Sequence, residues 1–258
     1  MNTSNWTKFP HDASDFTYEG DQLADSWAEL HRGDCEPLPE DERLQEAWRR
    51  YPAGDFAGAV ELAEEIGMTA HAVANKAAGI YADYLEEDDD VKLAIYEEGI
   101  RRAEAAIDQF PDDANAHYFH AFLLGRYSQG VSITKALAEG VGGKIRTSLN
   151  NALELAPEHA EAHTAMGLYH AEIIDKIGKM IGAMTYGANA GEAMEHFQRA
   201  LELTPEAPIA HIEYGNGLYL LYGDKRLEES NAAYEKAAAI KPIEAMQKLD
   251  VEFAKASV

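Results

Sequence analysis

The sequence predicts an all-α protein built as an array of helical hairpins, and three observations support this prediction. An Ala-His pair opens a helix-like stretch four times, at His71, His117, His163 and His211, with intervals of 46, 46 and 48 residues. Each of the last three histidines follows a proline by six residues. No segment of useful length alternates apolar and polar residues, as a half-buried strand would. Self-similarity at a fixed period is typical of repeat proteins, in which each unit buries one face against its neighbours.

The first element along the chain is an irregular arm, residues 1 to about 40, which glycines and prolines punctuate. Within it we expect a short helix from Asp21 to Leu30, because Leu23, Trp27 and Leu30 share one helical face. A free solvated tail would not usually carry large aromatic residues, which here are Trp6, Phe9, Phe16, Tyr18 and Trp27. The arm is therefore expected to pack against the first repeats as their cap.

Residues 41–242 form the predicted array of about five hairpins. The first hairpin has a helix after Pro39, with acidic residues near the positive end of its dipole, and a second helix from Phe56 to Ala63. Later second helices end alike, with small residues around an aromatic or leucine side chain and then a proline. Proline stops a helix because it pushes the preceding residue out of the helical region. Residues 243–258 are then predicted to hold a C-terminal helix from Ala245 to Ala256.

These spacings resemble the tetratricopeptide repeat, a helix-turn-helix unit of about 34 residues with Trp, Leu-Gly and Tyr on its first helix and Ala, Phe, Ala and Pro on its second. The resemblance rests on three hairpins, whose matching residues are Gly54, Phe56 and Ala59 in the earliest, Met166-Gly167, Ala193, Phe197, Ala200 and Pro205 in a later one, and Tyr214-Gly215, Tyr234, Ala237 and Pro242 in the last. It implies a right-handed superhelix with elongated helices and a concave groove.

In that register each recurring histidine stands where the family keeps its tryptophan. One hypothesis is that the four histidines form a metal site or a proton relay. The alternative is that each imidazole packs between the two helices of its unit, with one ring nitrogen in need of a partner. The spacing favours packing, because equivalent residues on successive repeats lie roughly 10 Å apart, whereas a zinc ion holds its ligands at about 2 Å.

Three internal units are longer than the consensus. From recurring histidine to closing proline they span 40, 40 and 42 residues, whereas the consensus needs about 28. The additional residues, enough for roughly three turns of helix each, include Leu85–Val91, Gln129–Lys144 and Lys179–Ala190. Long helix pairs with such inserts resemble the regulator of microtubule dynamics family and its bacterial relatives, most closely over residues 124–157. This resemblance implies an interaction role, with no catalytic residues to carry over.

The charge balance excludes some classes of partner. There are 46 acidic and 22 basic residues, and the formal charge is −24. Such a surface repels phosphates, so we expect no nucleic acid and no anionic membrane as a general partner. No run approaches about 18 apolar residues, so neither a membrane span nor a secretory leader is expected. The single cysteine, Cys35, lies among acidic residues that predict a raised thiol pKa, and the expected location is cytoplasmic.

Several segments resemble ligand-binding motifs without completing them. Gly140–Lys144 lacks the spacing and the preceding strand of a phosphate loop. Glu86–Asp90 lacks the spaced ligands and the glycine of a calcium loop. Two pairs of histidines have helical spacing without the order of a zinc motif: His159 with His163, and His117 with His120. We therefore predict no enzyme activity, no cofactor and no metal.

The leading hypothesis is a non-catalytic module that binds another protein or a peptide in the concave groove. The groove positions of tetratricopeptide proteins fall in this sequence on Lys76, Ile80, Tyr118, Phe122, Arg126, Thr164, Leu168, Glu172, Ile212, Asn216 and Tyr219. Some family members clamp a peptide carboxylate with Lys-x3-Asn. That pair is absent here, since Ile212 stands four residues before Asn216.

The alternative is binding of a small hydrophobic ligand. Ile173, Ile174, Ile177 and the segment 180–186 form a long apolar stretch that either adds helical core or lines a cavity on the concave side. Flexible methionines, here Met180 and Met184, suit adaptable binding surfaces. Transporter-associated tetratricopeptide proteins are thought to work in this way, although the missing export signal argues against that version. A third and weaker hypothesis is an enzyme or metal protein built on the histidines.

Overall fold

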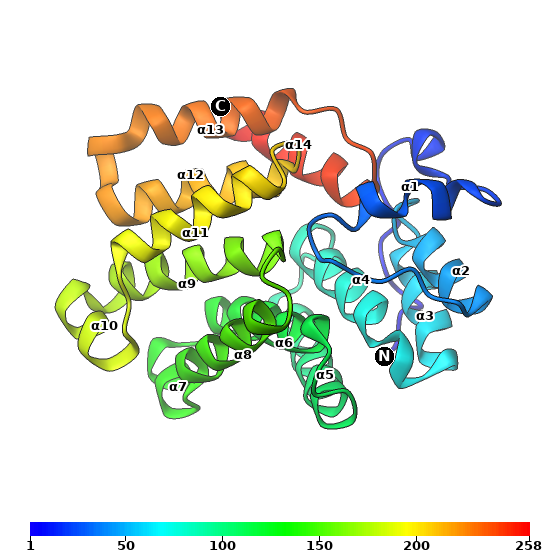
Figure 1. The fold of residues 1–258 in the computed structure, drawn as a ribbon, viewed down its shortest axis with the longest axis horizontal. Helices are drawn as coiled ribbons and strands as arrows, with labels where there is room; N and C mark the ends of the chain where they lie inside the picture. Colours follow the sequence, from blue (N-terminus) through cyan, green and yellow to red (C-terminus); the bar gives the residue numbers. More distant parts are fainter.

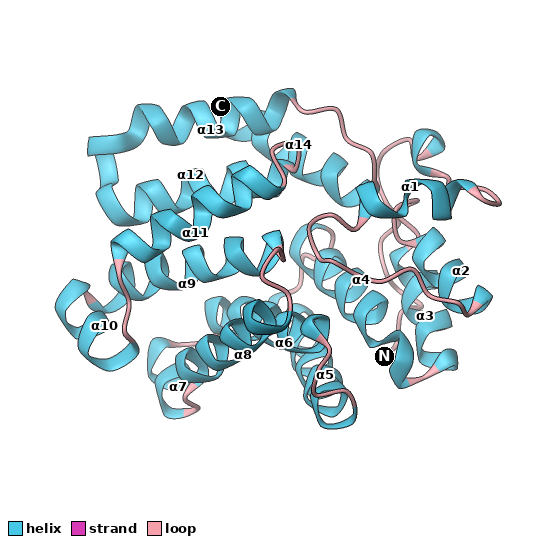
Figure 2. Cartoon of the chain, viewed as in Figure 1, coloured by secondary structure: helices cyan, strands magenta, loops and turns pink.

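The computed structural model describes residues 1–258 as helices joined by short loops, without any β-strand (Figure 2). The helices are α1 (Gln22–Leu30), α2 (Glu42–Arg50), α3 (Phe56–Ile66), α4 (His71–Tyr84), α5 (Asp89–Gln109), α6 (Ala114–Gly130), α7 (Ile133–Ala138), α8 (Val141–Leu155), α9 (Ala160–Ile177), α10 (Lys179–Tyr186), α11 (Ala190–Leu203), α12 (Pro208–Tyr222), α13 (Leu227–Ala239) and α14 (Ala245–Ser257). The predicted all-α fold is confirmed.

The helices pack as five hairpins, in which α2 pairs with α3, α4 with α5, α6 with α8, α9 with α11, and α12 with α13. Each hairpin also contacts the next, because α3 packs on α4, α5 on α6, α8 on α9 and α11 on α12. Figure 1 shows the array curving from α2 and α3, in blue and cyan, around to α12 and α13 in orange. The fold is the tetratricopeptide-like superhelix that the sequence predicts.

The three inserts fold in two different ways. The first, Leu85–Val91, forms the loop between α4 and α5 and the first three residues of α5, which extends over 21 residues. The second and third form separate short helices, α7 and α10, at the tips of their hairpins (Figure 1). Gly140 follows α7, and Gly178 and Gly187 bracket α10, all three with positive φ, which glycine adopts without strain. The inserts therefore lengthen the hairpins without adding a layer to the array.

The recurring proline and histidine are joined by a hydrogen bond. His117, His163 and His211 each donate from Nε2 to the carbonyl of the proline six residues earlier, at 2.8, 3.0 and 2.8 Å. His71 has no such proline, and its Nε2 instead pairs with Asp113 Oδ2 of the next unit at 2.9 Å. The six-residue spacing thus reflects a repeated bond that fixes the turn before each first helix. The predicted packing role is confirmed.

We expect His117→Phe to lower the free energy of unfolding by about 1–2 kcal/mol, because the ring still fills its site while the Pro111 carbonyl loses its donor. Urea unfolding followed by circular dichroism measures the change. Phe119→Leu, at a buried position on the same helix without a hydrogen bond, reports the cost of repacking alone. Equal stability of His117→Phe and the native chain would show that the bond contributes nothing.

The N-terminal arm packs along the first two hairpins, as predicted. The Trp6 ring stacks on Tyr81 of α4 with centroids 3.9 Å apart, and Phe9 meets the Phe56 ring of α3 edge-on. Trp27 of α1 packs edge-on against Trp48 of α2. A single core cluster runs from α1 through α9. The arm is therefore part of the folded array and not a free tail.

Helix α14 returns to the beginning of the array. Ala245 N donates to Pro52 O at 2.8 Å, and Tyr18 Oη donates to Ile243 O at 2.7 Å. The other side of α14 packs on α13 and α12. Figure 1 shows α14, in red, between the orange hairpin and the blue arm. The predicted C-terminal helix is confirmed as α14, and it bridges the last hairpin and the first, a contact that the repeat pattern does not predict.

Candidate functional site

The concave side holds a half-open cavity of about 170 Å³. Its walls come from the first helices of successive hairpins, α4, α6, α9 and α12, together with α7, α8 and Met246 of α14. Most of the lining is apolar, and the large apolar side chains include Ile80, Phe122, Ile133, Leu137, Val141, Ile145, Leu149, Leu168, Ile173 and Ile177. The charged lining residues are Lys76 and Asp83 on α4, Arg126 on α6, Glu161, Glu172 and Lys176 on α9, and Glu213 on α12. The cavity is therefore amphipathic, and we call its end beside the arm, where Lys76 and Glu161 lie, the polar end.

Eight of the eleven predicted groove residues line this cavity, namely Lys76, Ile80, Tyr118, Phe122, Arg126, Thr164, Leu168 and Glu172. They lie on α4, α6 and α9, where they recur at i, i+4 and i+8 and so share one face of each helix. The register deduced from the repeats thus identifies the concave face of these three helices.

The three residues on α12 lie elsewhere. Ile212 is buried against Ala237 and Ala254, on the side of α12 that α13 and α14 cover. Asn216 is held by Tyr234 Oη, and Tyr219 is more than half exposed outside the cavity. Ile209 and Glu213 line the cavity in their place. The consensus register is wrong for this helix, because α14 packs on the face that the register assigns to the groove.

The inserts contribute unequally to the cavity. Ile133, Leu137 and Val141 of the second insert line it, whereas the third insert supplies only Tyr186. The side chains of Met180, Ile181 and Met184 are 75, 56 and 83% exposed and stand outside it. The expectation that these residues line a cavity is wrong, because α10 packs on α9 through its small residues and buries only Gly182.

Three groups of cavity residues are absent from the prediction made from the sequence. Tyr84 continues the Lys76–Ile80 series by one more turn of α4, so extending the register by four residues would have found it. Met246 lies on α14, outside the repeats, and no periodic signal reaches it. Ile145 and Leu149 belong to a second helix, which tetratricopeptide consensus positions place away from the groove.

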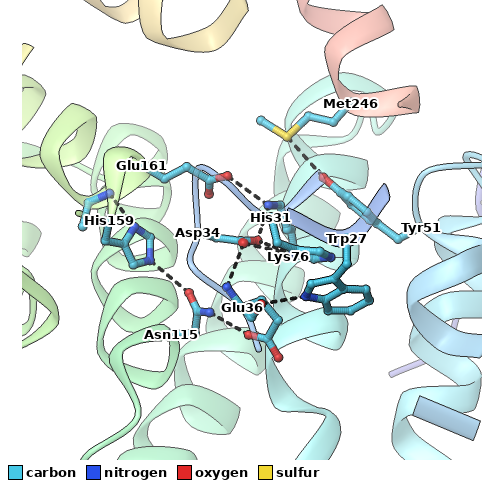
Figure 3. Close-up of polar contacts among 11 residues, drawn as sticks. Trp27, His31, Asp34, Glu36, Tyr51, Lys76, Asn115, His159, Glu161 and Met246 are labelled. Atoms are coloured by element: carbon cyan, nitrogen blue, oxygen red, sulfur yellow. Dashed lines mark hydrogen bonds and ion pairs between the residues drawn. The ribbon is translucent and has the colours of Figure 1, made fainter. Parts of the chain in front are cut away.

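A buried ion cluster forms the polar end of the cavity (Figure 3). Lys76 Nζ donates to Asp34 Oδ2 at 2.6 Å and to Glu161 Oε1 at 2.9 Å. His31 Nδ1 contacts the other oxygen of Asp34 at 2.9 Å. The arm, the second hairpin and the fourth hairpin therefore meet at one ammonium group. We call Lys76, Asp34, Glu161 and His31 the hub.

The hub strongly shifts the pKa values of Asp34 and Lys76. Burial alone would raise the pKa of Asp34, but Lys76 and His31 hold it well below its usual value. Burial would lower the pKa of Lys76, but Asp34 and Glu161 raise it well above its usual value. Both groups are thus charged at neutral pH. The fixed salt bridges leave Lys76 neither a nucleophile nor a free cation for a ligand.

A second chain of hydrogen bonds links the hub region to the repeats. Glu36 Oε2 accepts from Asn115 Nδ2 at 2.6 Å, and Asn115 Oδ1 pairs with His159 Nε2 at 3.0 Å. His159 Nδ1 accepts from the Ala162 amide and so caps α9. Burial and the Asp34 charge raise the pKa of Glu36 to about 8, while burial lowers the pKa of His159 to about 4. His159 therefore serves as a neutral helix cap.

A second ion pair lies farther along the cavity, on α6. Arg126 Nε contacts Asp83 Oδ2 at 2.8 Å, its Nη2 approaches Glu213 Oε1 at 3.5 Å, and its guanidinium lies 5.5 Å from the centre of the Phe122 ring. Arg126 is half-buried and, like Lys76, has two carboxylate partners. The cavity therefore presents apolar surface to a ligand and holds its interior charges in pairs.

The segments that resemble phosphate-binding and calcium-binding loops form the starts of helices. Gly140–Lys144 begins α8, and Asp88 within the acidic run caps α5 through its side chain. Burial raises the pKa of the Cys35 thiol, with Asp34 adding to the effect. No group of three or more His, Cys, Asp or Glu side chains is arranged to hold a metal ion. None of the helices combines the length and apolar character needed to cross a membrane.

Comparison with known proteins places this arrangement in a family. The model of regulator of microtubule dynamics protein 1-3 matches residues 68–255, nearly three quarters of the chain. The chain belongs to this family. The match covers α4 to α14 and therefore every helix that lines the cavity.

Individual relatives agree with the family model. Regulator of microtubule dynamics protein 3 from Rattus norvegicus and that from Mus musculus are each 26% identical over 136 residues. That alignment includes 50% of this chain and 28% of either relative, so the chain spans under a third of their length. A thermophilic TPR protein of Thermus thermophilus superposes with a TM-score of 0.59 at 15% identity, covering 84% of this chain and all of that one.

The family match divides the hub. Lys76 and Glu161 lie within the part that matches regulator of microtubule dynamics proteins, whereas His31 and Asp34 lie before it, on the arm. One of the two carboxylates that pair with Lys76, that of Asp34, therefore comes from a segment outside the matched region.

Proposed function

We propose that this family member is a non-catalytic binding module that holds an apolar segment of another protein or a peptide in its concave cavity. One observation carries the proposal: the cavity is walled mainly by apolar side chains and half open to solvent. Such a pocket suits one or two large apolar side chains as anchors, with the surrounding groove excluding water.

The polar groups of the cavity support a binding role. Lys76 and Arg126 are each held by two carboxylates, so neither is free to take part in acid-base or nucleophilic chemistry. Their paired charges fix the helices around the cavity. We also propose that the protein acts in the cytoplasm, the location expected from its sequence.

The test compares two exposed apolar positions on the full chain. Ile133→Glu places a charge at the cavity mouth, whereas Leu155→Glu places one outside it, and both side chains are already partly exposed. Proteins captured from the native host by the unmodified chain should be retained by Leu155→Glu and lost from Ile133→Glu. A photo-reactive residue at position 133 should crosslink to the same proteins. Retention by both variants would refute the cavity as the binding site.

A small apolar ligand is the second candidate, favoured by the size of the cavity. At about 170 Å³ it is close to the ~150 Å³ apolar cavity that holds benzene in an engineered protein. Native mass spectrometry of purified protein distinguishes this function from the first. A small molecule retained by the unmodified chain and by Leu155→Glu, and lost from Ile133→Glu, would support it. Loss of captured proteins without any bound small molecule would contradict it.

A further inference from the structure

Helix α14 closes the concave groove from one end. Its N-terminal end is attached to the first hairpin, where Ala245 N donates to Pro52 O and Tyr51 Oη lies 3.1 Å from Met246 Sδ. Met246 also lines the cavity. Figure 3 shows its side chain beside that of Tyr51. Farther along, α14 packs on α12 and α13. Because α14 is not a member of any of the five hairpins, its release would leave each of their helix pairs in contact.

The surface that holds α14 contains more acid than it can neutralise. Glu244 is 6% exposed and faces the hub, whose lysine already donates to Asp34 and Glu161. Asp250 is fully buried, and one of its oxygens accepts from Tyr84 Oη while Oδ2 has no hydrogen-bond partner. An ionised carboxylate in this position costs several kcal/mol of desolvation unless it is paired. Ionisation of either group therefore weakens the contact.

We propose that α14 is a proton-controlled latch, which closes the groove when Glu244 and Asp250 are neutral and opens it when they ionise. The proposal rests on the cavity being the binding site, because opening would remove Met246 from its wall and widen access to it. The apolar contacts of Leu249 and Val251 hold the closed state. The two carboxyl groups make that state conditional on pH.

The groups that face the two carboxyls set the direction of the switch. Around Glu244 and Asp250 these are Asp34 and His31 on the arm, Lys76, Asp83 and Tyr84 on α4, Arg126 on α6, Glu161 on α9, Glu213 on α12, and the nearby Tyr18 and Tyr51. Burial raises the pKa of Glu244 to about 8 and the pKa of Asp250 to about 7.

The sign of the pH effect follows from these values. When α14 is released, both groups return to ordinary pKa values near 4. The closed state therefore binds more protons between about pH 4 and pH 8, and raising the pH through this range favours opening. The equilibrium changes most steeply between about pH 5 and pH 7, where the closed state holds both protons and the released state holds almost none.

Hydrogen exchange on the full chain tests the latch. After correction for the intrinsic exchange rate, amides of α14 should be protected at least tenfold less at pH 8.5 than at pH 6, since each unit of pH shifts such an equilibrium by up to tenfold for each group. Amides of α6 and α9 should keep their protection. In the double variant Glu244→Gln and Asp250→Asn, α14 should show equal protection at both pH values.

The matched control is Glu252→Gln, which removes an exposed acid from the same helix and should leave the native pH dependence unchanged. Equal loss of protection in α6, α9 and α14 would indicate general unfolding and overturn the proposal, as would an unaltered pH dependence in the double variant.

Nile red, a neutral apolar dye, should fluoresce more with the native chain at pH 8.5 than at pH 6. If the amides of α14 lose protection at pH 8.5 but Nile red fluorescence is the same at both pH values, α14 does not control access to the groove. Neither readout requires the natural partner, so failure of the latch leaves the proposed function separately testable.

Discussion

Lys76→Met should destabilise the chain by about 3–5 kcal/mol, because it removes the cation from a buried ion cluster. Methionine fills nearly the same space, so the loss is chiefly electrostatic. Asp34, which is fully buried, and Glu161 would lose their shared donor while Glu244 stays beside them. Chemical unfolding followed by tryptophan fluorescence reports the change directly, since Trp27 and Trp48 lie next to His31.

Two further measurements separate charge from packing at this position. The penalty should shrink as the pH falls toward 4, because the stranded carboxylates can then protonate. Adding Asp34→Asn and Glu161→Gln to Lys76→Met should recover much of the lost stability, since the buried charges are then removed together. A penalty that is constant with pH and unchanged in the triple variant would mean that the hub acts through shape alone.

The hub also shows where prediction from the sequence ends. The repeat register places Lys76 on the concave face, and the structure agrees. Its partner Asp34 lies 42 residues earlier, on an arm that has no period, so no spacing could connect the two. The repeat is visible in the sequence because equivalent positions of every unit make the same packing contacts. A contact made once, between non-equivalent segments, leaves no such signal.

The failure on α12 has a related cause. Consensus positions assume that a first helix has a repeat on each side and an open concave face. At the end of this array α14 packs on α12, so Ile212 faces a helix and not the groove. By contrast, the link between proline and histidine is local, and its six-residue spacing was visible before its hydrogen bond was known. The sequence therefore predicts local features such as the proline–histidine spacing correctly, whereas it does not predict how α14 packs at the end of the array.

Phe197→Ala should lower the free energy of unfolding by about 3–5 kcal/mol, as expected for truncating a fully buried aromatic side chain. Phe197 of α11 is 1% exposed and lies between two glycines of neighbouring first helices. A Cβ atom at Gly167 of α9 would come within 2.8 Å of its ring, and one at Gly217 of α12 within 2.2 Å. The two glycines let both helices close on the ring, so no nearby side chain can fill the space that alanine would leave.

The same geometry predicts which part of the array loosens. Phe197 joins the α9–α11 hairpin to α12, and in repeat proteins the contacts between neighbouring units carry much of the cooperativity. Phe197→Ala should therefore expose α12, α13 and α14 to hydrogen exchange before α2 to α6. Phe253→Ala, at a half-exposed position on α14, should change stability by less than about 0.5 kcal/mol and leave the exchange pattern intact. Uniform loss of protection along the chain in Phe197→Ala would instead mean that the array unfolds as a single unit, with α14 binding its two ends into one cooperative ring.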